Sequence, residues 1–218
     1  MPLTPDELHH LPNVISAPRF ATYLRACANN RESALNLYRW NLEISAAFMG
    51  PLHLCEIAIR NGVSESLGAV HGGTWPWTQG FVRSLPNPRR GYSPKRDLQN
   101  TAQRHPTTGK VVSDLKFAFW ERTLTQRYDQ SIWQSQFFAS FSGAPQNGGF
   151  AIARQAYNSD IRNIRLFRNR IAHHEPIFTR DLQQDLDRIL KVIQWRSPTA
   201  STWLSSIEIA SNLIRQQP

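Results

Sequence analysis

Hydrophobic residues recur at intervals of three, four or seven along residues 33–70, which is the spacing of one face of an α-helix. This segment therefore predicts one long helix. Near its middle we expect a kink at Gly50 and Pro51, because proline removes a backbone donor. The positions that make the pattern are Leu35, Leu42, Met49, Leu52, Ile59, Val63 and Leu67.

Similar spacing predicts further helices on both sides of this segment. Ser113 and Ser197 are the expected caps of two of them, since a serine hydroxyl accepts a hydrogen bond from a free amide of the first turn. Before Pro18 we expect only a loose start, and a short aromatic segment covers residues 132–141. The remaining expected helices span residues 18–29, 113–128, 150–174, 181–193 and 198–215.

The fold class follows from what these patterns have in common. No alternating strand pattern of useful length is present, and neither an internal repeat nor a coiled-coil heptad is found. We therefore predict an all-α fold, a single domain over residues 1–218, built as a bundle on the two long helices 33–70 and 150–174.

Residues 71–112 differ in character from the rest of the chain. They hold five of the 14 prolines, five of the 11 glycines and seven Lys or Arg against one acid, so this insertion carries +6 of the net charge. Ser93 and Pro94 resemble the cap and first position of a short helix that reaches about Arg104, and we expect the rest to be irregular.

Basic and aromatic residues alternate in this insertion, which is typical of surfaces that hold a single nucleic-acid strand by charge and stacking. An ordinary solvated loop is the alternative. The residues concerned are Arg89, Arg90, Lys95 and Arg96, interleaved with Trp75, Trp77 and Tyr92.

The composition favours a phosphate-containing partner. The net charge is +9, and 21 of the 25 basic residues are arginine, whose planar guanidinium binds phosphate oxygens in pairs. A bacterial sequence that prefers arginine codons would show the same bias. A hydrophobic content of 40% excludes a disordered chain, because there is enough apolar mass to offset chain entropy.

The two cysteines indicate a reducing compartment. Cys27 and Cys55 lie in predicted helices without the spacing of a metal or redox site, so we expect buried thiols, no metal and no cofactor. The amino terminus lacks a basic-then-apolar signal pattern, and no run approaches about 18 consecutive apolar residues. We expect a cytoplasmic location and no membrane partner.

The run from Arg168 to Phe178 is where the sequence points most clearly to chemistry. Ile161, Ile164 and Ile171 form an apolar stripe at helical spacing, and Arg168 falls on that stripe. A guanidinium placed there must find a partner or a substrate.

The same helix presents several polar groups to one region. Asn169 and His173 are four residues apart and share a face, which Arg165 and Arg162 extend backward. Such groups suit metal-independent cleavage of RNA by its own 2′-hydroxyl, in which histidine moves a proton and arginine stabilises charge on phosphorus oxygens. A second copy of the helix in a symmetric dimer would supply another set.

A purely structural interpretation remains open for these residues. Arg168 would then belong to a buried salt bridge, and His173 would contact the carbonyls at the helix end. The neighbouring His173 and His174 point apart, which argues against a shared metal.

Glu56 is a second charged residue on an apolar stripe. It lies four residues after Leu52 and three before Ile59, and a buried carboxylate and a buried guanidinium invite pairing. We expect Glu56 to contact Arg168 or its immediate neighbours, either as a structural salt bridge or to orient a catalytic group. Arg60, one turn further, either flanks the same cleft or lies on a solvated face.

The run Leu166 to Phe178, with Arg168, Asn169, His173, His174, Glu175 and Pro176, resembles the signature of Abi-like abortive-infection proteins in the HEPN superfamily. Other segments resemble the same family and extend the likeness from about Ser16 to Leu204. They are Leu35 to Asn41, Leu54 to Asn61, Gly109 to Trp120, Arg127 and Tyr128, Trp133, and Ile193 to Pro198 with Trp203.

This resemblance implies an all-α HEPN fold, commonly dimeric, with a metal-independent RNase centre at the dimer interface. Arg168, Asn169 and His173 match the catalytic positions, with Glu56, Arg165 and His174 in support. It further implies a toxin or phage-defence effector with RNA as substrate and a cognate antitoxin or phage-derived trigger. A non-catalytic RNA-binding or sensing module is the alternative.

Overall fold

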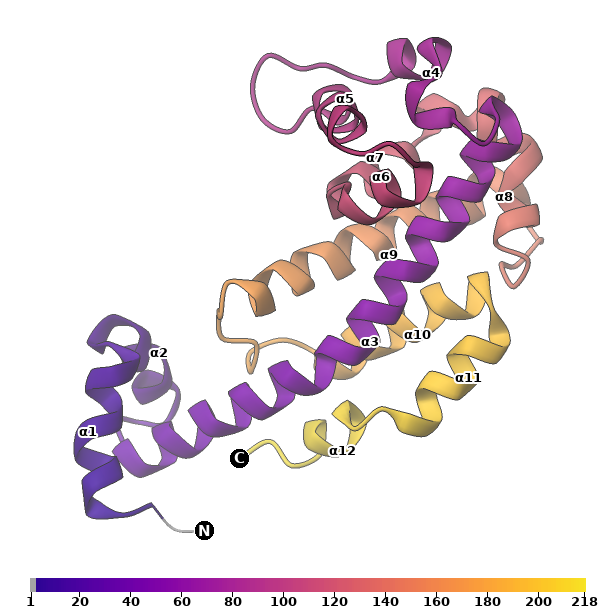
Figure 1. Ribbon diagram of the computed structural model, residues 1–218. Helices are drawn as coiled ribbons and strands as arrows, with labels where there is room; N and C mark the ends of the chain where they lie inside the picture. Colours follow the sequence, from indigo (N-terminus) through magenta and orange to yellow (C-terminus); the bar gives the residue numbers. More distant parts are fainter. Residues whose placement is uncertain (1–2) are drawn as a thin grey trace.

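The protein is all-helical in the computed structural model, which describes residues 3–218; no strand occurs in that range. Its axis is α3 (Arg31–His71), which runs diagonally across Figure 1. The side chain of Asn30 caps α3 by accepting a hydrogen bond from the Ser33 amide at 2.9 Å. The predicted long helix is confirmed and continues through Pro51 without ending.

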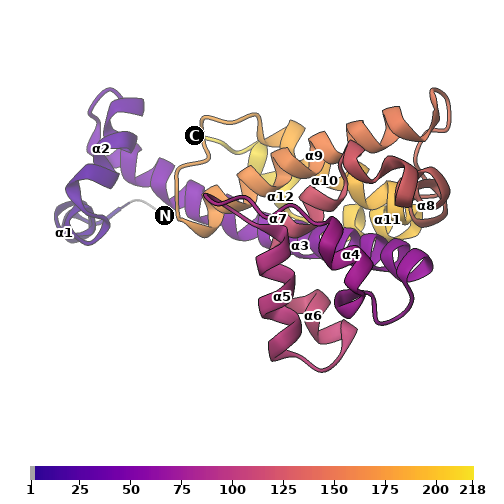
Figure 2. The ribbon, with the colours of Figure 1, turned by 90° about the horizontal axis from the view of Figure 1, so that it is seen from above.

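Two helices precede α3; the sequence predicted the second of them, over residues 18–29, and a loose start before Pro18. They are α1 (Pro5–Ile15) and α2 (Ala17–Ala26), and they lie at the far end of α3 from the rest of the molecule (Figures 1 and 2). A capping box begins α1, because Thr4 accepts from the Glu7 amide while Glu7 accepts from the Thr4 amide. The predicted helix over residues 18–29 is therefore confirmed as α2, while the loose start expected before Pro18 was wrong.

Residues 71–112 are mostly helical and partly buried; the short helix predicted to reach about Arg104 is confirmed, but the rest is not the irregular loop that was expected. Trp75 is only 1% exposed and packs against Phe81, Phe119 and Trp120, which ties this segment to the core. The predicted cap at Ser93 is confirmed, since its hydroxyl accepts from the Arg96 amide. The elements are η1 (Trp75–Trp77), α4 (Gln79–Ser84), α5 (Pro94–Arg104) and α6 (Thr108–Asp114).

Ser113 does not cap a helix. It lies in the last turn of α6, where its hydroxyl donates to the Lys110 carbonyl at 2.9 Å, and Lys116 is the residue that precedes α7 (Phe117–Thr123). The predicted helix over residues 113–128 is therefore replaced by several short ones. After α7 come η2 (Gln126–Tyr128), the π-helix η3 (Asp129–Trp133) and α8 (Gln134–Ser140).

The C-terminal part contains α9 (Gly149–Ala172) and α10 (Leu182–Arg196), close to their predicted bounds. Ser197 caps the next helix as predicted, accepting from the Ala200 amide at 3.2 Å. The single last helix expected to reach Arg215 is instead two helices, and the Glu208 carboxylate between them accepts a hydrogen bond from the Ser211 amide at 3.0 Å. These two are α11 (Pro198–Ile207) and α12 (Ala210–Ile214).

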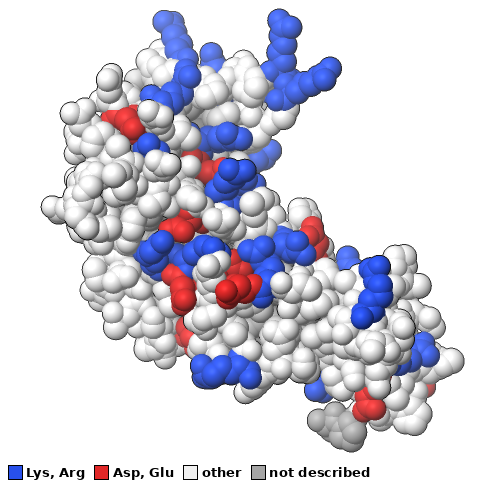
Figure 3. Space-filling view, turned by 180° about the vertical axis from the view of Figure 1, so that it is seen from behind, with Lys and Arg blue, Asp and Glu red and all other residues white. Residues whose placement is uncertain are grey.

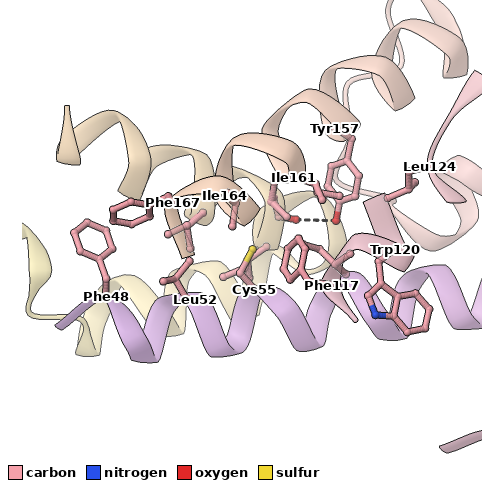
Figure 4. Packing of buried hydrophobic residues seen from close by; sticks show 14 of the residues in the cluster. Phe48, Leu52, Cys55, Phe117, Trp120, Leu124, Tyr157, Ile161, Ile164 and Phe167 are labelled. Atoms are coloured by element: carbon pink, nitrogen blue, oxygen red, sulfur yellow. Dashed lines mark hydrogen bonds between the residues drawn. The ribbon is translucent and has the colours of Figure 1, made fainter. Parts of the chain in front are cut away.

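The core lies where α3 packs against α9 and α10. In Figure 4, Phe48, Leu52 and Cys55 of α3 face Ile164 and Phe167 of α9. The rings of Phe48 and Phe167 meet edge to face at 4.8 Å. Leu42 and Met49, expected on the apolar face of α3, are instead 53% and 56% exposed.

By length and composition alone, α3 is apolar enough to cross a membrane. Its most apolar window has a mean hydropathy of 1.4, and 39% of that window is buried inside the protein. The central helix of a helical core meets the same criterion, and α3 packs along α2, α8, α10 and α12.

Candidate functional site

The candidate site lies at the C-terminal end of α9. The helix stops in a Schellman motif: the Glu175 amide bonds to the Arg170 carbonyl at 2.8 Å, and the His174 amide to the Ile171 carbonyl at 3.0 Å. His174 takes the left-handed position of this motif, with φ of 56°. His173 and His174 are both exposed, so solvent and ligands reach this helix end.

Arg168 is not the buried charge that the sequence predicted. Its side chain is 43% exposed, and the buried face of α9 is completed by Phe167, which is 0% exposed. The predicted stripe itself is confirmed, since Ile161, Ile164 and Ile171 are all buried, and only the placement of Arg168 on it was wrong. Arg168 sits at the edge of that face, where it borders both the core and solvent.

Glu56 and Arg168 are brought together as expected. The Glu56 Oε2 atom lies 3.8 Å from the Arg168 Nε atom, and the Glu56 side chain is only 14% exposed. This contact is an ion pair without a hydrogen bond, and the Arg168 side chain remains partly open to solvent. The geometry fits both a structural ion pair and a positioning role.

Glu56 has a closer partner in Arg60, on the same helix. Arg60 Nη2 donates to Glu56 Oε1, and Arg60 Nη1 donates to the Ser113 carbonyl at 2.8 Å. The Arg60 side chain is 21% exposed, so it does not lie on an open solvated face. Because its guanidinium is already engaged twice, Arg60 is not a free phosphate ligand in this arrangement.

Arg165 is committed to a partner that sequence reasoning missed. It forms an ion pair with Glu121 of α7, whose side chain is 9% exposed. Asn158 adds to this contact by donating to the Glu121 backbone carbonyl at 2.7 Å. The signal was present, since Glu121 follows Phe117 by four residues on an apolar face, just as Glu56 follows Leu52.

Arg168, Asn169 and His173 thus share an open helix end. Arg165 is turned away into its pair with Glu121, while Asn169 is half-buried. Arg170 closes the adjacent loop by donating to the Pro176 carbonyl at 2.8 Å. Figure 3 shows a band of mixed positive and negative residues across the hollow of the molecule.

The four basic residues of segment 71–112 that were expected to bind a nucleic-acid strand differ in their surroundings. Arg89 and Arg90 are exposed on the loop before α5. Arg96 instead braces that loop, because its Nη2 atom donates to the Pro88 carbonyl at 3.0 Å. Lys95 is half-buried at the start of α5.

Of the aromatic residues expected to stack on a nucleic-acid strand here, one is unsuitable. Trp75 is buried and its Nε1 atom donates to the Ser64 hydroxyl at 3.1 Å, so its faces are covered. Trp77 is 37% exposed and keeps part of its ring open. The Tyr92 hydroxyl donates to Asp97 at 2.7 Å, and burial raises the pKa of Tyr92.

No metal cluster is found within residues 3–218, where three or more His, Cys, Asp or Glu side chains never gather. Cys55 is fully buried beside Glu56, and burial followed by the carboxylate charge raises the pKa of its thiol. A thiol held neutral in this way is a packing residue rather than a nucleophile. Cys27 is half-buried.

Comparison with known proteins adds no relationship. No protein family model, no curated protein and no solved structure matches this chain.

Proposed function

We propose that this protein is a metal-independent endoribonuclease of the Abi-like, HEPN type, with its active centre at the C-terminal end of α9. The observation that carries the proposal is the state of Arg168. It forms an ion pair with the mostly buried Glu56, yet its side chain remains 43% exposed, so it can meet a phosphate. Asn169 and the exposed His173 follow it on the same helix end.

The chemistry requires few groups. The ribose 2′-hydroxyl attacks the adjacent phosphorus, the bond to the 5′-oxygen of the next nucleotide breaks, and a 2′,3′-cyclic phosphate remains. His173 acts as general base or acid, a role that contributes roughly 100- to 10,000-fold in rate. Arg168 stabilises the negative charge that develops on the phosphorus oxygens, and Asn169 holds the imidazole or a phosphate oxygen.

A second copy of the chain completes this scheme. One imidazole cannot easily remove a proton and supply another at the same time, whereas a symmetric pair of α9 helices offers two. Leu166 is 45% exposed and lies two helical turns before His173 on the open side of α9. Leu166→Arg is expected to give monomers in sedimentation and to lower cleavage; an unchanged oligomeric state would contradict this role.

The biological setting follows from the same proposal. An enzyme that cuts host or phage RNA would act as an abortive-infection effector or toxin in the cytoplasm, restrained by an antitoxin or released by a phage-derived trigger. Expression of the wild type is then expected to arrest bacterial growth, while His173→Ala is tolerated.

The test is incubation of purified protein with an RNA pool in EDTA. Wild type is expected to cleave, and Arg168→Ala and His173→Ala to lose cleavage while retaining their helical circular dichroism. Arg162→Ala is the matched control, because Arg162 is exposed on the same helix and outside the proposed centre. Equal cleavage by all four proteins would overturn the proposal.

A non-catalytic RNA-binding or sensing module is the second candidate. The exposed Arg89 and Arg90 on the loop before α5 favour it, since they offer charge to a strand without any catalytic group nearby in sequence. Tight, salt-dependent RNA binding without cleavage would support this candidate, and Arg89→Gln with Arg90→Gln should then reduce the salt dependence.

A further inference from the structure

Glu56 stands between two arginines that compete for one carboxylate. Its Oε1 atom accepts from Arg60, and its Oε2 atom lies 3.8 Å from the Nε atom of Arg168. The two guanidiniums differ in their surroundings, since Arg60 is 21% exposed and Arg168 is 43% exposed. The contact of Glu56 with Arg60 is the closer and more buried of the two. The attraction between Glu56 and Arg168 is therefore the weaker one.

Arg60 is itself anchored from a third element. Its Nη1 atom donates to the backbone carbonyl of Ser113 in the last turn of α6, while Nη2 holds Glu56. A planar guanidinium that makes two directed contacts is fixed in place more firmly than a single pair would be. The position of α6 therefore determines where Arg60 can hold the carboxylate.

We propose that Arg60 is a positioning residue that keeps Arg168 available to phosphate by drawing the Glu56 carboxylate toward itself. This inference rests on the proposed function of Arg168. It deepens that proposal by naming the residue that keeps the Arg168 guanidinium available to phosphate. Without Arg60, the mostly buried Glu56 has Arg168 as its remaining cationic partner, and the two close into a tighter pair. The guanidinium is then partly neutralised before any RNA arrives.

The consequence is a specific pattern among variants. Arg60→Gln lowers the availability of Arg168, and adding Glu56→Gln to it restores that availability because the competing carboxylate is gone. A lysine at position 60 keeps the charge but cannot hold Glu56 and the Ser113 carbonyl together, so Arg60→Lys falls between wild type and Arg60→Gln. A merely structural Arg60 would give no such recovery, since a second substitution would add damage.

The experiment measures Arg168 directly, through its rate of modification by the arginine-selective reagent phenylglyoxal, followed by peptide mapping. We expect modification about two- to fivefold slower in Arg60→Gln than in wild type, and recovery in Arg60→Gln with Glu56→Gln. Arg39→Gln is the matched control, because Arg39 and Glu43 form an exposed pair at the same spacing on α3. Equal rates in the single and double variants would overturn the proposal.

A second readout separates this inference from the proposed enzyme. RNA cleavage by the same variants should follow the same order as modification of Arg168. If wild type cuts no RNA, the proposed function fails, while the modification rates still decide whether Arg60 controls Arg168. Should Arg60→Gln fold poorly by circular dichroism, the test uses Arg60→Lys. Phenylglyoxal must then modify Arg168 more slowly in Arg60→Lys than in wild type, and an unchanged rate would refute the proposal.

Discussion

Glu56 of α3 and Arg168 of α9 meet at 3.8 Å between carboxylate Oε2 and guanidinium Nε, joining the two longest helices at the edge of the core. The acid is mostly buried and the base is nearly half exposed. Because of this difference in exposure, the pair presents the positive charge of Arg168 to solvent near the end of α9. The proposed RNase centre depends on that presentation.

Arg165 should affect stability more strongly than its neighbours on α9. Removing it leaves the buried carboxylate of Glu121 without its cation, so we expect Arg165→Ala to lower the free energy of unfolding by about 1–3 kcal/mol. Urea denaturation measures the change. Arg162→Ala, at an exposed position, should stay within about 0.5 kcal/mol of wild type; equal losses in both variants would refute the assignment.

His174 should be replaceable by glycine with a gain in stability. Its φ of 56° lies in the left-handed region, which costs a residue with a Cβ atom free energy that glycine avoids. We expect His174→Gly to raise the free energy of unfolding by about 0.5–1 kcal/mol and His174→Val to lower it. Thermal unfolding compares the two, and a loss in His174→Gly would contradict the Schellman geometry.

His71 should make the fold less stable in mild acid. Burial lowers its pKa below the ordinary 6.5, so the unfolded chain binds a proton more readily than the folded protein. Stability therefore falls as the pH drops through 6.5 toward the folded pKa. Urea denaturation at pH 7.5 and pH 5.5 should show a smaller acid-induced loss in His71→Gln than in wild type; an identical loss would exclude this histidine as a cause.

The long helices could be predicted because their apolar spacing persists over many turns. The predicted segment 33–70 became Arg31–His71, and 150–174 became Gly149–Ala172. The short helices α4, α6 and α7 were not predicted as separate elements, because seven residues or fewer give too little repetition to establish a period. Ser113 misled for a local reason, since its hydroxyl bonds backward to Lys110 instead of forward to a free amide.

The sequence predicted which residues meet at the candidate site better than it predicted how deeply each of them is buried. Glu56 was paired with Arg168 on the argument that two charges on apolar stripes need each other, and the structure brings them into contact. The apolar stripe of α9 is buried as predicted, but Phe167 packs against Phe48 in the core and leaves the neighbouring Arg168 at the edge of the buried face. Glu121 was not predicted as the partner of Arg165, although it follows Phe117 by four residues on the apolar face of α7.

The most direct test of the account is the chemistry at the cut. RNA cleaved by the wild type in EDTA should carry 2′,3′-cyclic phosphate ends, and a single 2′-deoxy substitution at the cleavage site should abolish cutting there. Mass spectrometry of the fragments measures the ends. Fragments with 5′-phosphates and 3′-hydroxyls, or cleavage that needs an added divalent cation, would contradict the assignment of catalysis to Arg168 and His173.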